Sequence, residues 1–270
     1  MFSKEINNEH HVAIGVPRKF ISGNLKEMGL DPTFLIVYCS IDRWHMYDGC
    51  SSYYKSSVLN ICEDVGKHYP INCKKPFPKI ASQIENSLRY MENTGMITLQ
   101  KGKFENYDEQ FVVKINPDNF YSDDYIAIDI RHLDFILNSK STIKKENILL
   151  VLLYCLSKYT YMVSFDKTTG ETKYVFHQVY SESNKKTSEK IGLSDKTIAS
   201  VLKVLAGSKD SEKPLIVHSG LYYSIDGMPR SYPDIYTENS LGWEDRIRAE
   251  LDYYKNRQKE SKDMGVVIND

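Results

Sequence analysis

Four polar side chains fall on one side of a predicted helix near residue 200, and their chemistry suits a nucleic-acid duplex. They are Lys196, Thr197, Ser200 and Lys203. Ammonium and hydroxyl groups donate hydrogen bonds to phosphate oxygens and to the edges of bases in a groove. A single surface lysine is more often simply solvated, so this interpretation depends on the shared helical position of the four residues.

The opposite side of the same helix is apolar at intervals of three and four residues, which is typical of a stripe that faces a core. The stripe consists of Ile198, Val201, Leu202 and Leu205. Upstream, residues 184–198 predict a short helix, a break at Gly192 and then the new helix. Glycine suits the left-handed conformation that ends a helix. Ser194 or Asp195 can cap the helix that follows by accepting a backbone N–H.

The elements around these two helices are predicted from periodicity and turn residues. Residues 125–130 alternate like a strand, and residues 146–160 carry leucines at helical spacing. A turn-rich stretch over 165–172 precedes another short strand, and the two together indicate a hairpin. After the second helix, residues 214–224 predict two strands around Ser219-Gly220.

The same pattern occurs earlier in the chain at a nearly constant offset. Ile126-Ala127-Ile128 matches Val12-Ala13-Ile14 at 126 − 12 = 114, and Tyr154-Cys155 matches Tyr38-Cys39 at 154 − 38 = 116. Three apolar residues of the helical stripe also have partners at an offset of 114. These pairs are Ile84 with Ile198, Leu88 with Leu202, and Met91 with Leu205. A repeat of domain size indicates two tandem domains rather than a solenoid.

The first copy predicts the same order of elements. They are a strand over 12–16, helices over 33–47, 57–65 and 78–95, and strands over 96–100 and 111–115. The polar sides of the third helix carry Lys79, Gln83, Asn86 and Arg89, although Arg89 could instead favour the helix dipole. Lys101 and Lys103 fall in the loop between the last two strands. The linker over 67–77 is unusually long for a standard groove-docking geometry.

Helix, helix, turn, helix and hairpin is the order of elements in the winged helix. Residues 188–198 resemble the helix-turn-helix core of that superfamily, whereas Thr187 and Ser188 stand where the family usually has an apolar residue and an alanine. The strand before the core helix and the hairpin at 166–171 are similar to replication initiators of plasmids and phages, of the RepA_N and DnaD type. This resemblance implies binding to an origin and recruitment of host replication proteins, without catalysis.

We therefore predict an α+β chain with two tandem winged helix-turn-helix domains, at 1–116 and 117–235, and a C-terminal helix and tail at 236–270. The tail helix carries apolar residues at helical spacing and either packs on the second domain or pairs with a second chain. The predicted ligand is double-stranded DNA, and a homodimer and host replication proteins are further candidate partners. The predicted DNA contacts are Lys79, Gln83, Asn86, Arg89, Lys101, Lys103, Lys185, Lys186, Ser194, Lys196, Thr197, Ser200 and Lys203.

Composition excludes several other classes of function. The 270 residues carry a formal net charge of −1, so any nucleic-acid surface must be a local patch. No apolar run approaches the ~18 residues of a membrane span, and the N-terminus lacks an export signal. We therefore expect a cytoplasmic chain with reduced cysteines. The cysteines are too widely spaced for a zinc site, and common enzyme motifs are absent, so no catalytic residue, metal or cofactor is predicted.

Two alternatives use the same surfaces. A transcriptional regulator of a mobile element would bind DNA through the same helices, at a promoter rather than at an origin. A scaffold in a conjugation or segregation complex would turn the polar helix faces toward a protein partner instead.

Overall fold

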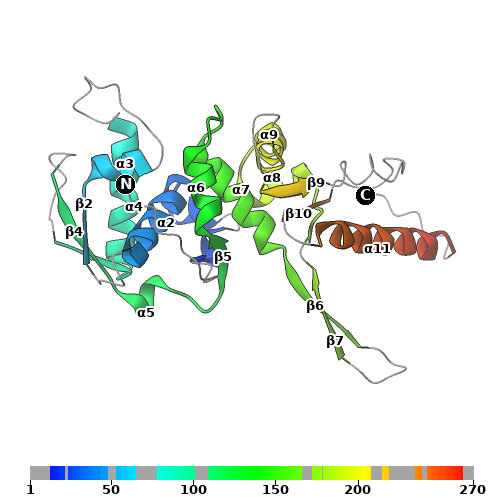
Figure 1. Ribbon diagram of the computed structural model, residues 1–270. Helices are drawn as coiled ribbons and strands as arrows, with labels where there is room; N and C mark the ends of the chain where they lie inside the picture. The colour runs from blue at the N-terminus through cyan, green and yellow to red at the C-terminus, as the bar shows by residue number, and fades with distance from the viewer. Residues whose placement is uncertain are drawn as a thin grey trace, which may run out of the picture. The chain divides into compact units, whose positions relative to one another are not determined.

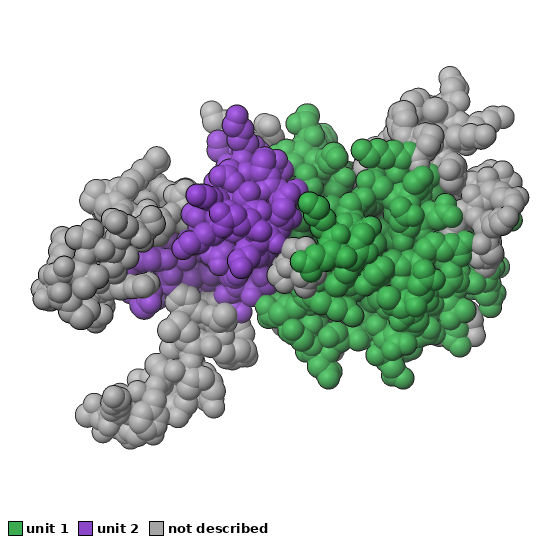
Figure 2. All heavy atoms as spheres, turned by 180° about the vertical axis from the view of Figure 1, so that it is seen from behind, with its two compact units in different colours: residues 1–150 green, residues 151–270 purple. Residues whose placement is uncertain are grey.

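The computed structural model describes residues 13–21, 24–47, 53–64, 78–100, 109–165, 172–177, 179–207, 215–218, 235–238 and 242–263. Helices and strands occur throughout this part of the chain, as an α+β protein requires (Figure 1). The chain divides into two compact units, residues 1–150 and 151–270 (Figure 2). Among the described residues, no helix has the length and apolar character needed to cross a lipid bilayer.

Within the first unit, three of the helices and a three-stranded antiparallel sheet follow one another along the chain. They are α2 (Thr33–Tyr47), β2 (Tyr53–Ser56), α3 (Val58–Asp64), α4 (Pro78–Asn93), β3 (Ile97–Leu99) and β4 (Phe111–Ile115). The order of strands in the sheet is β2-β4-β3, so the last strand lies in the middle. Val113 at its centre pairs with Tyr54 on one side and with Leu99 on the other.

The second half of the chain repeats this succession. It consists of α7 (Lys145–Ser157), β8 (Val179–Tyr180), α8 (Asn184–Ile191), α9 (Asp195–Leu205), β9 (Ile216–His218) and β10 (Tyr236–Glu238). The sheet order is β8-β10-β9, again with the last strand in the middle. The added elements are the antiparallel hairpin of β6 (Thr160–Phe165) and β7 (Thr172–His177), and helix α11 (Trp243–Asp263).

The predicted repeat is also visible in the cores. Ile84, Leu88 and Met91 of α4 are buried, and so are their counterparts Ile198, Leu202 and Leu205 of α9. The apolar stripes read from the sequence are therefore the packed faces of these helices. Two predicted ends lie in a different element: Thr160 begins β6 instead of ending a helix, and Ile130 begins α6 (Ile130–Asn138) instead of ending a strand. The predicted strand beyond Ser219 lies outside the described residues.

The first strands of the two copies pair with each other inside the first unit. Strand β1 (Ala13–Pro17) lies antiparallel to β5 (Tyr125–Asp129), and Ile14 faces Ile128. Since 128 − 14 = 114, these partners are the same position of the repeat. Their side chains are fully buried. The remaining elements of this unit are η1 (Arg18–Phe20), α1 (Asn24–Glu27), α5 (Pro117–Phe120) and α6 (Ile130–Asn138). Residues 117–150, which the sequence analysis grouped with the second domain, thus belong to the first compact unit.

Helix α11 packs on the second unit, which was one of the two alternatives for the tail. Ile247 and Leu251 form a buried cluster with Val179 of β8 and with Ile235. Trp243 and Tyr254 pack against this cluster and are partly buried. Arg246 adds a hydrogen bond from Nε to the Thr237 hydroxyl, 2.8 Å away.

Candidate nucleic-acid interface

The turn between α8 and α9 is formed by the capping residues that the sequence predicts. The N–H of Gly192 donates to the Ser188 carbonyl at 2.9 Å, and Gly192 has φ of 71°, in the left-handed region. Ser194 caps α9, because its Oγ accepts the Thr197 N–H at 3.2 Å. These local hydrogen bonds fix where α9 begins, and burial of its apolar stripe leaves the polar side facing outward.

Three of the predicted contact residues form an exposed line along α9. Lys196, Ser200 and Lys203 are exposed and follow one another at i, i+4 and i+7. Ser194 is exposed as well, but it and the half-buried Thr197 are engaged with each other, because their hydroxyl oxygens lie 2.8 Å apart. The line of three side chains is therefore the part of the predicted set that is best placed to reach a ligand.

Helix α8 carries three more exposed cations. Lys185 and Lys186 were predicted from the sequence, whereas Lys190 was missed, although it follows Lys186 by one helical turn. We call the five lysines the basic face: Lys185, Lys186, Lys190, Lys196 and Lys203. With the two acidic residues of these helices, Glu189 and Asp195, the formal charge of α8 and α9 is 5 − 2 = +3. The whole chain has −1, so the positive charge is local, as the sequence required.

The equivalent helices of the first unit carry the opposite charge. Lys79 and Asn86 of α4 are exposed, and Gln83 and Arg89 are half-buried. The Arg89 Nη1 lies 2.7 Å from the Glu92 Oε2, so this cation is paired within its own helix. Counting Lys79 and Arg89 against the four carboxylates of α3 and α4 gives 2 − 4 = −2. The carboxylates are Glu63, Asp64, Glu85 and Glu92. The predicted contacts Lys101 and Lys103 lie outside the described residues.

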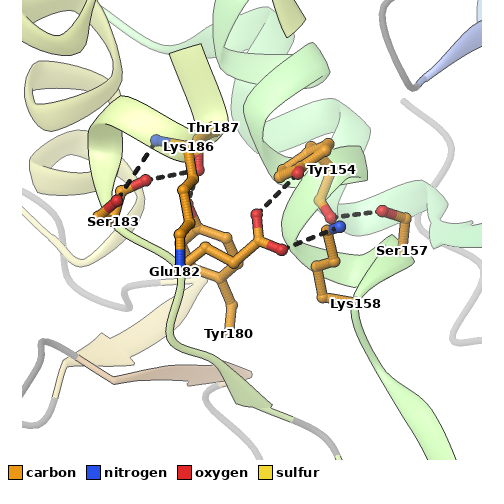
Figure 3. A network of polar contacts seen from close by, with 8 residues as sticks. All are labelled: Tyr154, Ser157, Lys158, Tyr180, Glu182, Ser183, Lys186 and Thr187. Carbon is orange, nitrogen blue, oxygen red and sulfur yellow. Dashed lines mark hydrogen bonds and ion pairs between the residues drawn. The ribbon is translucent and has the colours of Figure 1, made fainter. Parts of the chain in front are cut away.

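The buried hydroxyl of Thr187 explains one departure from the winged-helix pattern. Thr187 is fully buried, and its Oγ1 donates to the Ser183 carbonyl at 3.2 Å and hydrogen-bonds to the Tyr180 hydroxyl (Figure 3). A polar side chain is tolerated in a core when its hydrogen bonds are made. Burial raises the pKa of Tyr180 above its usual range, so its hydroxyl stays protonated and can donate.

A second polar contact connects α7 to the chain just before α8. The Tyr154 hydroxyl donates to the Glu182 Oε2 at 2.7 Å, and the Lys158 Nζ lies 3.1 Å from the Glu182 Oε1 (Figure 3). Lys158 also lies over the Tyr154 ring, 4.6 Å from its centroid. Burial, and then the hydrogen bond to Glu182, raise the pKa of Tyr154. The equivalent Tyr38 instead donates to the carbonyls of Gly15 and Phe120, at 3.1 and 2.9 Å.

Across the ranges that the structure describes, no three His, Cys, Asp or Glu side chains gather as a metal site would require. Cys39 and Cys155 are buried at equivalent places, and burial raises the pKa of both thiols. A protonated, buried thiol is a poor nucleophile.

Comparison of the chain with models of protein families, with curated proteins and with solved structures found no match. The case for the basic face as an interface therefore rests on its own geometry and charge.

Proposed function

We propose that this chain is a winged-helix protein that binds double-stranded DNA sequence-specifically, with α9 in the major groove. Winged-helix connectivity is supported by the order helix, strand, helix, helix, strand, strand, with the last strand central, in both halves. The observation that carries the proposal is the basic face: five exposed lysines on α8 and α9, in a chain of net charge −1.

The dimensions and chemistry of α9 suit this role. Its 11 residues span about 16 Å at the rise of an α-helix, and the major groove, about 12 Å wide, admits such a helix. Lys196, Ser200 and Lys203 would donate to base edges or to the flanking phosphates. Lys185, Lys186 and Lys190 on α8 would hold the phosphate backbone, which sets the register of the helix on the duplex.

Charge favours different roles for the two copies. Helices α8 and α9 carry +3, whereas helices α3 and α4 themselves carry −2, and the lysines near them, Lys67, Lys74 and Lys75, lie in the linker instead. We therefore assign groove reading to α9, and leave α3 and α4 to contacts with protein, such as host replication factors. Initiation of replication of a plasmid or phage in the cytoplasm is the cellular role that we favour. Transcriptional regulation is the alternative that uses the same DNA surface.

Selection of bound sequences from a random pool of duplexes, followed by fluorescence anisotropy titration, tests the proposal. If each lysine of the basic face neutralises one phosphate, log K should fall with log salt with a slope of about −4.5. The variant Lys196→Glu/Lys203→Glu should lose binding while remaining folded. The matched control is Lys140→Glu/Lys144→Glu, which makes the same charge change at two exposed lysines of the first unit.

Each outcome has a clear meaning. Loss in the α9 variant but not in the control supports the assigned face, and equal loss in both variants contradicts it. A selected motif that recurs at an origin supports an initiator, and one at a promoter supports a regulator. No binding by the unmodified chain even at low salt would overturn the DNA proposal in favour of the scaffold.

A further inference from the structure

Four consecutive residues, from the last residue of β8 to the N-cap of α8, attach this connection to three different helices. They are Tyr180, Ser181, Glu182 and Ser183, and we call them the anchor segment. Tyr180 hydrogen-bonds to Thr187 in α8, and Ser183 caps α8 by accepting the Lys186 N–H at 3.3 Å (Figure 3). These two residues therefore fix the first turns of α8.

Ser181 connects the anchor segment to the C-terminal helix α11. The Tyr254 hydroxyl donates to the Ser181 Oγ at 3.1 Å, and the Ser181 Oγ donates to the Glu250 Oε1 at 3.3 Å. Glu250 is only 4% exposed, so this contact lies in the packed interface between α11 and the sheet. Displacing the connection would remove this hydrogen bond from the buried Glu250 carboxylate, at a cost in free energy.

Glu182 connects the segment to α7 from another side. Both oxygens of its carboxylate are used, one by Tyr154 and the other by Lys158, at 2.7 and 3.1 Å. A carboxylate close to a phosphate-binding face opposes DNA electrostatically. The position of Glu182 is explained if its contacts with α7 hold the segment that precedes α8, while Lys158 balances its negative charge.

We propose that the anchor segment positions the α8–α9 pair for base readout, with α7 and α11 fixing it from outside the interface. This inference rests on the proposed DNA-binding function. Hydrogen bonds to base edges need accurate distances and angles, whereas phosphate contacts mainly set register and supply sequence-independent affinity. A small shift of α8, transmitted to α9 through the tight turn at Gly192, should therefore reduce specificity more than total affinity.

The test compares Glu182→Ala with Glu182→Gln. Alanine removes both contacts, whereas the glutamine carbonyl can still accept the Tyr154 hydroxyl. Affinity is measured for the duplex that the unmodified chain selects and for a scrambled duplex of the same length. For Glu182→Ala we expect about a tenfold loss on the selected duplex, the effect of losing one base contact, and less than about a twofold change in either direction on the scrambled one. Glu182→Gln should recover most of the specificity.

The contact between the anchor segment and α11 is tested with Tyr254→Phe. This substitution removes a hydroxyl that is far in sequence from the basic face. The ratio of the two affinities should fall here too. An equal loss on both duplexes would indicate fewer folded molecules and would overturn the positioning role. So would an unchanged ratio in both Glu182→Ala and Tyr254→Phe.

Hydrogen exchange separates this inference from the proposed function. Backbone amides of α8 should exchange faster in Glu182→Ala than in the unmodified chain, because the segment that caps its first turn is no longer held to α7. Unchanged protection would overturn the positioning role, whatever the DNA result. If the unmodified chain binds no duplex, the proposed function fails, and with it the role in base readout. Exchange then still decides whether the segment holds α8.

Discussion

Replacing Thr187 with valine tests why a hydroxyl occupies a core position of α8. Valine keeps the shape of threonine and removes only its hydrogen-bonding group. In the structure a chain of hydrogen bonds runs from the Tyr180 hydroxyl to the Thr187 hydroxyl and on to the Ser183 carbonyl. Tyr180 is 1% exposed and Thr187 is 0% exposed, so water cannot readily replace either group.

Substitutions at Thr187 and at Tyr180 in this series of hydrogen bonds should have different effects on stability. Thr187→Val strands the buried Tyr180 hydroxyl, which costs about 1–3 kcal/mol of unfolding free energy. Tyr180→Phe should cost less, about 0.5–1.5 kcal/mol, because Thr187 still donates to the Ser183 carbonyl at 3.2 Å. In the double variant no hydroxyl is stranded. We therefore expect its loss to be smaller than the sum of the single losses, by about 1 kcal/mol.

Urea unfolding followed by Trp243 fluorescence provides the assay. Trp243 packs against the cluster formed by β8 and α11, so it reports on the second unit. The chain has two tryptophans, and a Trp44→Phe background leaves Trp243 as the only one. Ser200→Ala removes an exposed hydroxyl from α9 and serves as the control, with an unchanged midpoint expected. Additive losses, or a Thr187→Val variant as stable as its parent, would refute this account of the hydroxyl chain.

Three further predictions concern the caps, an acid-sensitive contact and the thiols. Gly192→Ala should lower the unfolding free energy by about 1–2 kcal/mol, because alanine is strained in the left-handed conformation of this residue. An added Cβ would meet no other atom within 4 Å, so no steric clash adds to this cost. A much larger loss in urea unfolding would indicate a steric cause. The hydrogen bond from Arg131 lowers the pKa of Asp129 to about 2 from 3.8, so its stabilisation is complete above pH 3.8 and is lost as the pH falls through 2. Asp129→Asn, which can still cap α6, should reduce the acid dependence of unfolding over that range, and an unchanged pH profile would count against the ion pair. Cys39 and Cys155 should resist a thiol reagent at pH 8 until urea unfolds the chain, and rapid labelling of either would contradict their burial.

Local signals in the sequence were sufficient to predict most of the helices. The predicted bounds of α2 agree with the structure at both ends, and α9 begins after the serine cap that the sequence indicates. Both features depend on residues within a few positions of one another. Such signals act through single turns of helix, and they can be read without knowledge of the partner elements.

Contacts between distant segments could not be predicted in this way. The sequence marks β1 and β5 as strands and as repeats of each other, but period-2 alternation does not say which strand pairs with which. The grouping of residues 117–150 with the second domain followed from the repeat alone, whereas the pairing of β5 with β1 joins that segment to the first unit. A repeat in the sequence shows that two segments have the same pattern of residues, whereas the division into compact units depends on which residues are in contact.

The candidate site was predicted in the same uneven manner. Exposure of Lys196, Ser200 and Lys203 followed from helical periodicity, and Lys190 could have been found by extending that argument to α8. The anchor through Glu182 could not, because it joins side chains 28 residues apart and leaves no spacing pattern. The difference in charge between the two helix pairs was present in the sequence, and it became informative once the pairs were known to be equivalent.

The pairing of β1 with β5 also sets a waiting time during synthesis on the ribosome. Strand β1 ends at Pro17 and its partner begins at Tyr125, so 125 − 17 = 108 residues must be added before the pair can close. At about 5–20 residues per second this takes roughly 5–20 s. During that interval Ile14 and Val16, which are fully buried in the finished protein, have no strand to cover them. A nascent chain of this protein thus carries an apolar strand with an open edge, which is the kind of segment that chaperones bind.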